Sequence, residues 1–243
     1  SFVPWIKSNT PLNKKNKSWQ TFSASNIKKD KNWPVPKSLN KKEIKKIISD
    51  FVSTAIYANQ IHFDGLEIHM AHGYLLHEFF SPISNKRNDD YGGDIKKRIK
   101  LLREIAYTIR KIWPKNRILG ARITGTDHMK NGISIQDSKY LVKELEKIGF
   151  DYVCVSSGGI VSKTKMKQQK AFRVKIASKL KYGTKIKIRT SGQIDSVELA
   201  DRILRKNKCD FVAIGRKFLL DPNWLQKSNM RNKFFIPSQY NRG

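Results

Sequence analysis

Two histidines and a tyrosine lie within six residues of one another, immediately after a short apolar run. His69, His72 and Tyr74 belong to the segment 63–93, FDGLEIHMAHGYLLHEFFSPISNKRNDDYGG. Imidazole N–H groups can polarise a substrate oxygen, and a phenol with a pKa of about 10 can give a proton to a developing carbanion. Together these groups could hold one substrate oxygen by hydrogen bonds and supply a proton to the substrate.

Each of these residues also has a more ordinary interpretation. A single histidine or tyrosine most often packs in or near a core. His77 is the third histidine within nine residues, and this density favours a site. The histidines near Glu67 and Glu78 also admit a zinc site, but an HxxH that runs from a strand into a loop does not converge as a helical one does.

A strand must position this group. Residues 64–71 are predicted to form a buried strand, with Leu66 and Ile68 apolar and Glu67 and His69 polar, and the polar chemistry begins where that strand ends. In α/β proteins, active sites are built at this junction.

Helical and strand patterns alternate along the rest of the chain. Capping signals at Asn40 with Glu43, at Ser134 and at Asp195 with Glu198, and stops at Pro114 and Gly149, help to bound the helices. The predicted helices are 41–60, 95–112, 134–148, 174–180 and 195–204, and the predicted strands are 64–71, 118–124, 152–156, 185–190 and 211–214. This alternation predicts a parallel sheet in a barrel or in an open doubly wound fold.

Only five strands are visible, and polar or glycine-rich residues follow their carboxyl ends. That placement favours a (β/α)8 TIM barrel. Residues 1–40 are too polar and too rich in Asn, Lys and Pro to supply three more strands. We therefore expect the C-terminal portion of a barrel with about five of its eight strands, in one partial domain spanning 1–243: an irregular loop region at 1–40, βα units four to eight at 41–225 and a tail at 226–243.

Several segments together resemble the old yellow enzyme family, which comprises FMN-dependent ene-reductases with a TIM-barrel fold. The long run EIHMAHGYLLHEFFSPISNKRNDDYGG carries most of the resemblance, and the segments SWQTFSASNI, ARITGTD, DYVCVSSGG, IRTSGQI, FVAIGRKFLLDPNW and PSQYNRG extend it to the short bacterial branch. The part of the barrel before these segments is missing from the resemblance, so we expect a chain without the N-terminal third.

The resemblance implies roles for particular residues. His69 and His72 would bind and polarise the substrate oxygen of an activated alkene, Tyr74 would donate the proton, and hydride would pass from NAD(P)H through FMN. The residues that the resemblance assigns to the cofactor are Arg122, Ser157, Gly192, Gly215 and Arg216. Arg122 points to the inside of the barrel if Ala121 and Ile123 face the helices, although an internal salt bridge would also explain it, and glycines after strands are common as plain turns.

Arg242, near the end of the chain, resembles an arginine that reaches the neighbouring subunit's substrate site. This implies a homodimer or homotetramer, and a basic tail is the alternative.

Composition narrows the remaining classes. The 49 Lys and Arg residues exceed the 20 Asp and Glu residues, giving a net charge of +29, but the lysines are scattered, so we expect a solvated surface and not a nucleic-acid footprint. Two separate cysteines support neither an iron–sulfur centre nor a thiolate zinc site, and they fit reduced thiols in a cytoplasmic protein. No apolar run is long enough for a membrane span.

The alternatives to an FMN-dependent ene-reductase are a flavin-free or metal-dependent barrel enzyme, an inactive fragment and a nucleic-acid-binding protein.

Overall fold

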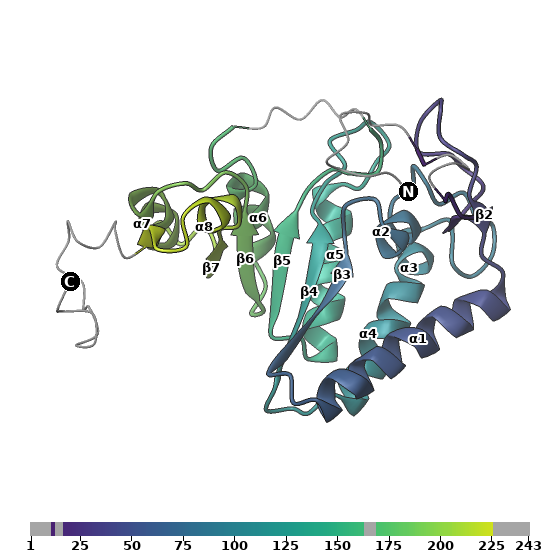
Figure 1. The fold of residues 1–243 in the computed structure, drawn as a ribbon, viewed down its shortest axis with the longest axis horizontal. Coiled ribbons are helices and arrows are strands. Elements are labelled where there is room, and N and C mark those ends of the chain that lie inside the picture. The colour runs from purple at the N-terminus through teal and green to yellow at the C-terminus, as the bar shows by residue number, and fades with distance from the viewer. Residues whose placement is uncertain (1–10, 13–16, 163–168, 226–243) are drawn as a thin grey trace.

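Five parallel strands form the central sheet of the computed structural model, which describes residues 11–12, 17–162 and 169–225. They are β3 (Gly65–Met70), β4 (Ile118–Thr124), β5 (Tyr152–Ser156), β6 (Lys187–Ser191) and β7 (Phe211–Ala213). Their order in the sheet is their order in the chain (Figure 1). A doubly wound sheet reverses its order at a switch point, so this unreversed order is that of consecutive strands in a (β/α)8 barrel. Among the described residues, β3 and β7 are not paired with each other, and the barrel is open there.

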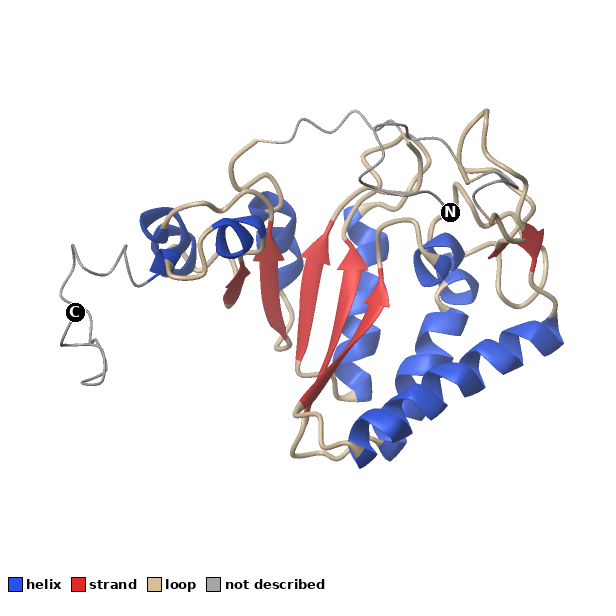
Figure 2. Ribbon diagram, viewed as in Figure 1, coloured by secondary structure: helices blue, strands red, loops and turns tan. Residues whose placement is uncertain are grey.

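The helices between these strands pack on one another in sequence. The helix α1 (Lys41–Gln60) contacts α4 (Lys100–Ile112), which contacts α5 (Ile135–Ile148), which in turn contacts α6 (Val174–Lys181). The helix α7 (Val197–Arg205) follows β6. Figure 2 shows β3 to β6 pointing toward the same edge of the sheet, where long loops gather. The loops that follow the strands therefore share one end of the fold.

Local signals explain most helix ends. Asn40 and Glu43 form the predicted capping box of α1, Ser134 and Asp137 form one at the start of α5, and Gly149 ends α5 in the left-handed region at φ 92°. The predicted cap at Asp195 is wrong, because the Ser196 side chain accepts from the amide of Leu199 instead.

The remaining differences concern short elements. The predicted helix 95–112 is divided at Ile99 into α3 (Ile95–Arg98) and α4, and two short helices, α2 (Leu75–Phe80) and α8 (Arg216–Leu220), carry no clear periodic signal. In a segment of five or six residues, Leu and Phe side chains are as consistent with a packed loop as with the apolar side of a helix.

The two faces of the sheet differ in polarity. Ile68, Ile123, Val153 and Ile188 are at most 5% exposed and face the helices. The alternate positions form one row across the inner face, in which the register aligns His69, Arg122, Cys154 and Arg189. Because Ala121 and Ile123 are buried under the helices, Arg122 has the inward orientation that the sequence predicts.

The composition of the segment before α1 suggested an irregular loop, but part of this segment forms regular structure. It contains two short parallel strands, β1 (Phe22–Ser23) and β2 (Lys37–Ser38). Arg87 holds this segment by donating to the carbonyls of Ala24 and Leu39 at 2.8 and 2.7 Å and pairing with Asp89 at 2.6 Å. The NKRNDD stretch therefore has a structural function: it connects the segment before α1 to the loop after α2.

Within the described part of the chain, none of the helices combines the length and the apolar character needed to cross a membrane.

Candidate active site

His69 and His72 form a directed chain of hydrogen bonds at the carboxyl end of β3. The backbone amide of Ala71 donates to His69 Nδ1 at 3.2 Å, so a neutral His69 carries its proton on Nε2. That nitrogen lies 3.3 Å from His72 Nδ1, and His72 Nε2 lies 2.6 Å from Ser156 Oγ. The only consistent assignment of neutral rings is His69 Nε2–H donating to His72 and His72 Nε2–H donating to Ser156.

Burial keeps both rings neutral. It lowers the pKa of His72 from 6.5 to about 3, and the positive charge of Arg122 lowers it further in the same direction. Burial and Arg122 also lower the pKa of His69, against a smaller opposing effect of Glu67. Near neutral pH, each imidazole therefore offers one N–H donor and carries no charge.

Tyr74 stands beside this pair. Its ring meets that of His69 edge-on, with centroids 5.2 Å apart, and its side chain is 62% exposed. The three predicted residues thus lie together, with a phenol open to solvent next to two imidazoles. In this structure the imidazoles bond to each other and to Ser156, so joint donation to one substrate oxygen requires these hydrogen bonds to be exchanged.

The backbone that carries His72 is unusual. His72 has φ 63° and Gly73 has φ 74°, both in the left-handed region. Gly73 lies against Gly159 of the loop after β5, where a Cβ on either glycine would overlap the other segment's backbone. Two loops from neighbouring strands therefore touch through their main chains, and this contact sets the position of His72.

His77 has a structural function. Its Nδ1 accepts from the amide of Gly73 at 2.7 Å, and its Nε2–H donates to Asp127 at 2.8 Å, with both side chains fully buried. Burial would raise the pKa of Asp127, but hydrogen bonds from His77, Ser81 and the Ile133 amide outweigh it and hold that pKa below its usual value. His77 thus ties the His72 loop to the loop after β4.

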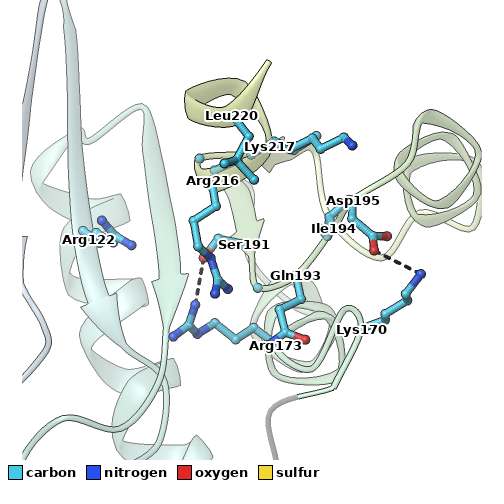
Figure 3. Close-up of a pocket in the computed structure, with 14 residues that line it drawn as sticks. Arg122, Lys170, Arg173, Ser191, Gln193, Ile194, Asp195, Arg216, Lys217 and Leu220 are labelled. Atoms are coloured by element: carbon cyan, nitrogen blue, oxygen red, sulfur yellow. Dashed lines mark hydrogen bonds and ion pairs between the residues drawn. The ribbon is translucent and has the colours of Figure 1, made fainter. Parts of the chain in front are cut away.

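A cavity of about 530 Å³ lies next to this group, at the carboxyl ends of β6 and β7 (Figure 3). Four of the five residues predicted to bind the cofactor line it: Arg122, Gly192, Gly215 and Arg216. Gly215 is the N-cap residue of α8, and Gly192 has φ 117° but stands four residues before the cap of α7. Arg122 connects the cavity to the histidines because it pairs with His69 across the sheet.

The charges that line the cavity are strongly unbalanced. The cationic side chains are Arg122, Lys170, Arg173, Arg216 and Lys217. Among the described residues that line the cavity, the only carboxylate is that of Asp195, which pairs with Lys170 at 3.0 Å. The Nε of Arg122 is buried with no hydrogen-bond partner in the described structure. An anion in the cavity would satisfy these groups.

Two residues of this region were absent from the sequence prediction. Arg173 donates to Ser157 Oγ at 3.2 Å and to Ser191 Oγ at 3.3 Å. The predicted Ser157 is therefore an acceptor for Arg173 and is not among the described residues that line the cavity. Ser156 is the second. The polar SSGG run marked its position, but only the arrangement of β3, β4 and β5 side by side in the sheet brings it to His72. The tail with Arg242 lies outside the described residues.

No group of three or more His, Cys, Asp or Glu side chains in the described ranges is arranged to hold a metal ion. The metal-dependent alternative therefore gains no support from these residues.

Comparison with known proteins identifies the family. The profile of the NADH:flavin oxidoreductase / NADH oxidase family matches residues 9–233. The chain belongs to this family. Among curated members it is 34% identical over 223 residues to an NADPH dehydrogenase from Bacillus pumilus and 31% identical over 224 residues to one from Bacillus subtilis. Each match covers 91% of this chain and 65% of the relative, so the chain spans about two thirds of the length of these NADPH dehydrogenases.

Two solved structures share the fold. An old yellow enzyme homologue from Zymomonas mobilis has a TM-score of 0.74 at 21% identity, covering 89% of this chain and 63% of its own. A 2-naphthoyl-CoA reductase has a TM-score of 0.79 at 22% identity, covering 87% of this chain and 33% of its own. The predicted family resemblance and the predicted barrel fold are both confirmed.

Proposed function

We propose that the protein binds FMN in the cavity at β6 and β7 and reduces the C=C bond of α,β-unsaturated carbonyl compounds and related activated alkenes. The observation that carries the proposal is the cross-strand pair of His69 and Arg122, which joins a neutral imidazole pair and a phenol to a cation-lined cavity. Membership of the flavin oxidoreductase family supports the cofactor, and the name NADPH dehydrogenase of two relatives supports NADPH as the donor.

The residues of the cavity fit a phosphorylated flavin. Arg122, with its buried unpaired Nε, would hold the anionic edge of the ring, and Arg216 with the backbone of Gly192 and Gly215 would hold the phosphate. A Cβ built at Gly215 would meet nothing within 4 Å, so a ligand can approach the backbone there. FMN, when bound, would supply hydride transfer from NAD(P)H to the alkene.

The polarising step falls to the imidazoles. The substrate oxygen would take the Nε2–H of His69 in exchange for its hydrogen bond to His72, and the Nε2–H of His72 would turn from Ser156 to the same oxygen. Because both rings are neutral, they can stabilise developing negative charge without giving up a proton. The exposed hydroxyl of Tyr74 would supply the proton to the α-carbon.

The test is flavin binding followed by turnover. The purified protein is titrated with FMN, and NADPH oxidation is then followed with and without 2-cyclohexenone. We expect one FMN per chain and oxidation that depends on the enone, with His69→Ala and His72→Ala losing enone-dependent turnover while retaining FMN. A protein that binds no flavin would overturn the proposal and favour a flavin-free barrel enzyme or an inactive chain.

Homo-oligomerisation through Arg242 and a cytoplasmic location stay predictions.

A further inference from the structure

Arg173 carries a half-buried positive charge that the catalytic assignment does not use. Its side chain reaches from the start of α6 into the cavity and bonds to Ser157 and Ser191, which are both hydroxyls and leave its charge uncompensated. No carboxylate is paired with it among the ion pairs of the described chain. A guanidinium in such a place needs an anion.

Two more guanidinium groups are directed to the same space. Figure 3 shows Arg173 and Arg216 converging beside Ser191, with Arg122 farther along the sheet. Burial lowers the pKa of Arg173 to about 10, and the nearby charges of Arg122 and Arg216 act in the same direction. Three positive charges at the edge of one cavity repel one another. A multiply charged anion bound between them would attract all three and offset that repulsion.

The geometry points to Arg173 as a further binding residue, which pairs with Arg216 on a phosphate monoester dianion and makes the cavity select phosphorylated over unphosphorylated ligands. The Ser157 and Ser191 hydrogen bonds orient the guanidinium so that little side-chain freedom is lost on binding. This inference rests on the proposed function, in which the dianion is the phosphate of FMN. The phosphate of NADPH has the same chemistry and is a separate arm of the test.

The experiment compares FMN with riboflavin, which lacks the phosphate. Affinities for both are measured by quenching of flavin fluorescence in the wild-type protein, Arg173→Gln, Arg173→Lys and the control Arg202→Gln. Arg202 is an exposed residue of α7, so its loss changes the net charge equally without touching the cavity. We expect Arg173→Gln to weaken FMN about tenfold or more and to leave riboflavin unchanged, because only the charge-assisted hydrogen bond is lost.

The lysine variant separates charge from structural support. Lysine keeps the positive charge, but it lacks the planar guanidinium whose separate N–H groups donate to Ser157 and to Ser191. If Arg173 binds the dianion, Arg173→Lys retains most of the preference for FMN over riboflavin even if its thermal unfolding temperature falls. If Arg173 merely braces the two serines, both variants weaken FMN and riboflavin alike, and the inference is overturned.

Other results have definite meanings. A wild-type protein that binds neither flavin overturns the proposed function and, with it, the role of Arg173. If FMN binds normally to Arg173→Gln but the ratio of NADPH to NADH affinity falls, the dianion belongs to the nicotinamide donor and the assignment to FMN is wrong. If neither the FMN to riboflavin ratio nor the NADPH to NADH ratio changes in Arg173→Gln, this inference is overturned and the proposed function stands.

Discussion

Ser156 accepts a hydrogen bond from His72 across 2.6 Å, although 84 residues separate the two in sequence. The contact joins the loop after β3 to the end of β5 over the intervening strand β4. The Ala71 amide sets the direction of this chain of hydrogen bonds, because it donates to His69 Nδ1 and so leaves the proton of His69 on Nε2, which donates to His72 Nδ1. Ser156 accepts the last hydrogen bond of the chain, from the Nε2–H of His72.

Replacement of Ser156 by alanine should disturb this chain. The Nε2–H of His72 would lose its partner, and an unpaired partly buried donor costs about 1–3 kcal/mol of the free energy of unfolding. We expect enone reduction to slow by about 10- to 100-fold, with FMN affinity unchanged, because the His72 ring is no longer held in place before the substrate oxygen takes over its Nε2–H. Urea unfolding and steady-state rates measure the two effects.

The matched control is Ser84→Ala. Ser84 is also buried and donates to the carbonyl of Glu78 at 2.8 Å, away from the histidines. It should lose comparable stability and retain its rate. Equal rates in Ser156→Ala and Ser84→Ala would show that Ser156 does not orient His72 for catalysis.

Replacement of Tyr74 by phenylalanine should remove the proton donor and little else. The hydroxyl belongs to a side chain that is 62% exposed, so we expect no measurable change in stability. Enone reduction should fall by about 10²–10⁴-fold, the usual contribution of a positioned acid, while NADPH oxidation with ferricyanide as acceptor should continue. Tyr57→Phe on α1, where Tyr57 is also exposed, serves as the control. A Tyr74→Phe protein with normal enone turnover would remove Tyr74 from the mechanism.

The sequence predicted the parts of this fold that depend on local signals. The helix α1 and the strand β5 match their predicted bounds, because a capping box and an uninterrupted apolar run are both readable without tertiary context. The carboxyl-edge position of His69 and the inward direction of Arg122 followed from strand alternation alone. His69 and Arg122 therefore lie next to each other on the sheet, as strand alternation predicts, and their catalytic and binding roles stay predictions.

Contacts between distant loops were beyond the sequence. Arg173 is one cation among 49, and only the fold places it beside Ser191. His77 had the same sequence signal as His69 and His72, but its burial against Asp127 makes it a structural residue. The difference depends on which loops meet, and no residue type or spacing records that.

Gly73 and Gly93 provide a matched test of the loop contact. Both have positive φ, so alanine at either position costs about 1 kcal/mol of backbone strain. At Gly93 a Cβ would meet nothing within 4 Å, whereas at Gly73 it would overlap the carbonyl oxygen of Gly159. We expect Gly73→Ala to lose about 1–3 kcal/mol more in urea unfolding than Gly93→Ala, and to lose activity because His72 moves. Similar losses for the two variants would mean that the loops separate without cost.

Glu78 should make stability depend on pH in an unusual direction. Burial raises its pKa from 4.5 to about 7, although a hydrogen bond from Ser23 and the charge of Lys29 oppose the shift. Between pH 4.5 and 7 the unfolded chain releases this proton and the folded protein keeps it, so the contribution of Glu78 to stability is complete below pH 4.5 and is lost as pH rises toward 7. Relative to Glu78→Gln, the wild-type protein should lose up to about 3 kcal/mol across this window. Urea unfolding at several pH values measures the difference between the two proteins, and Glu198→Gln on α7 provides the control. If the stability of wild type and of Glu78→Gln changed with pH in the same way, burial in the folded protein would not raise the pKa of Glu78.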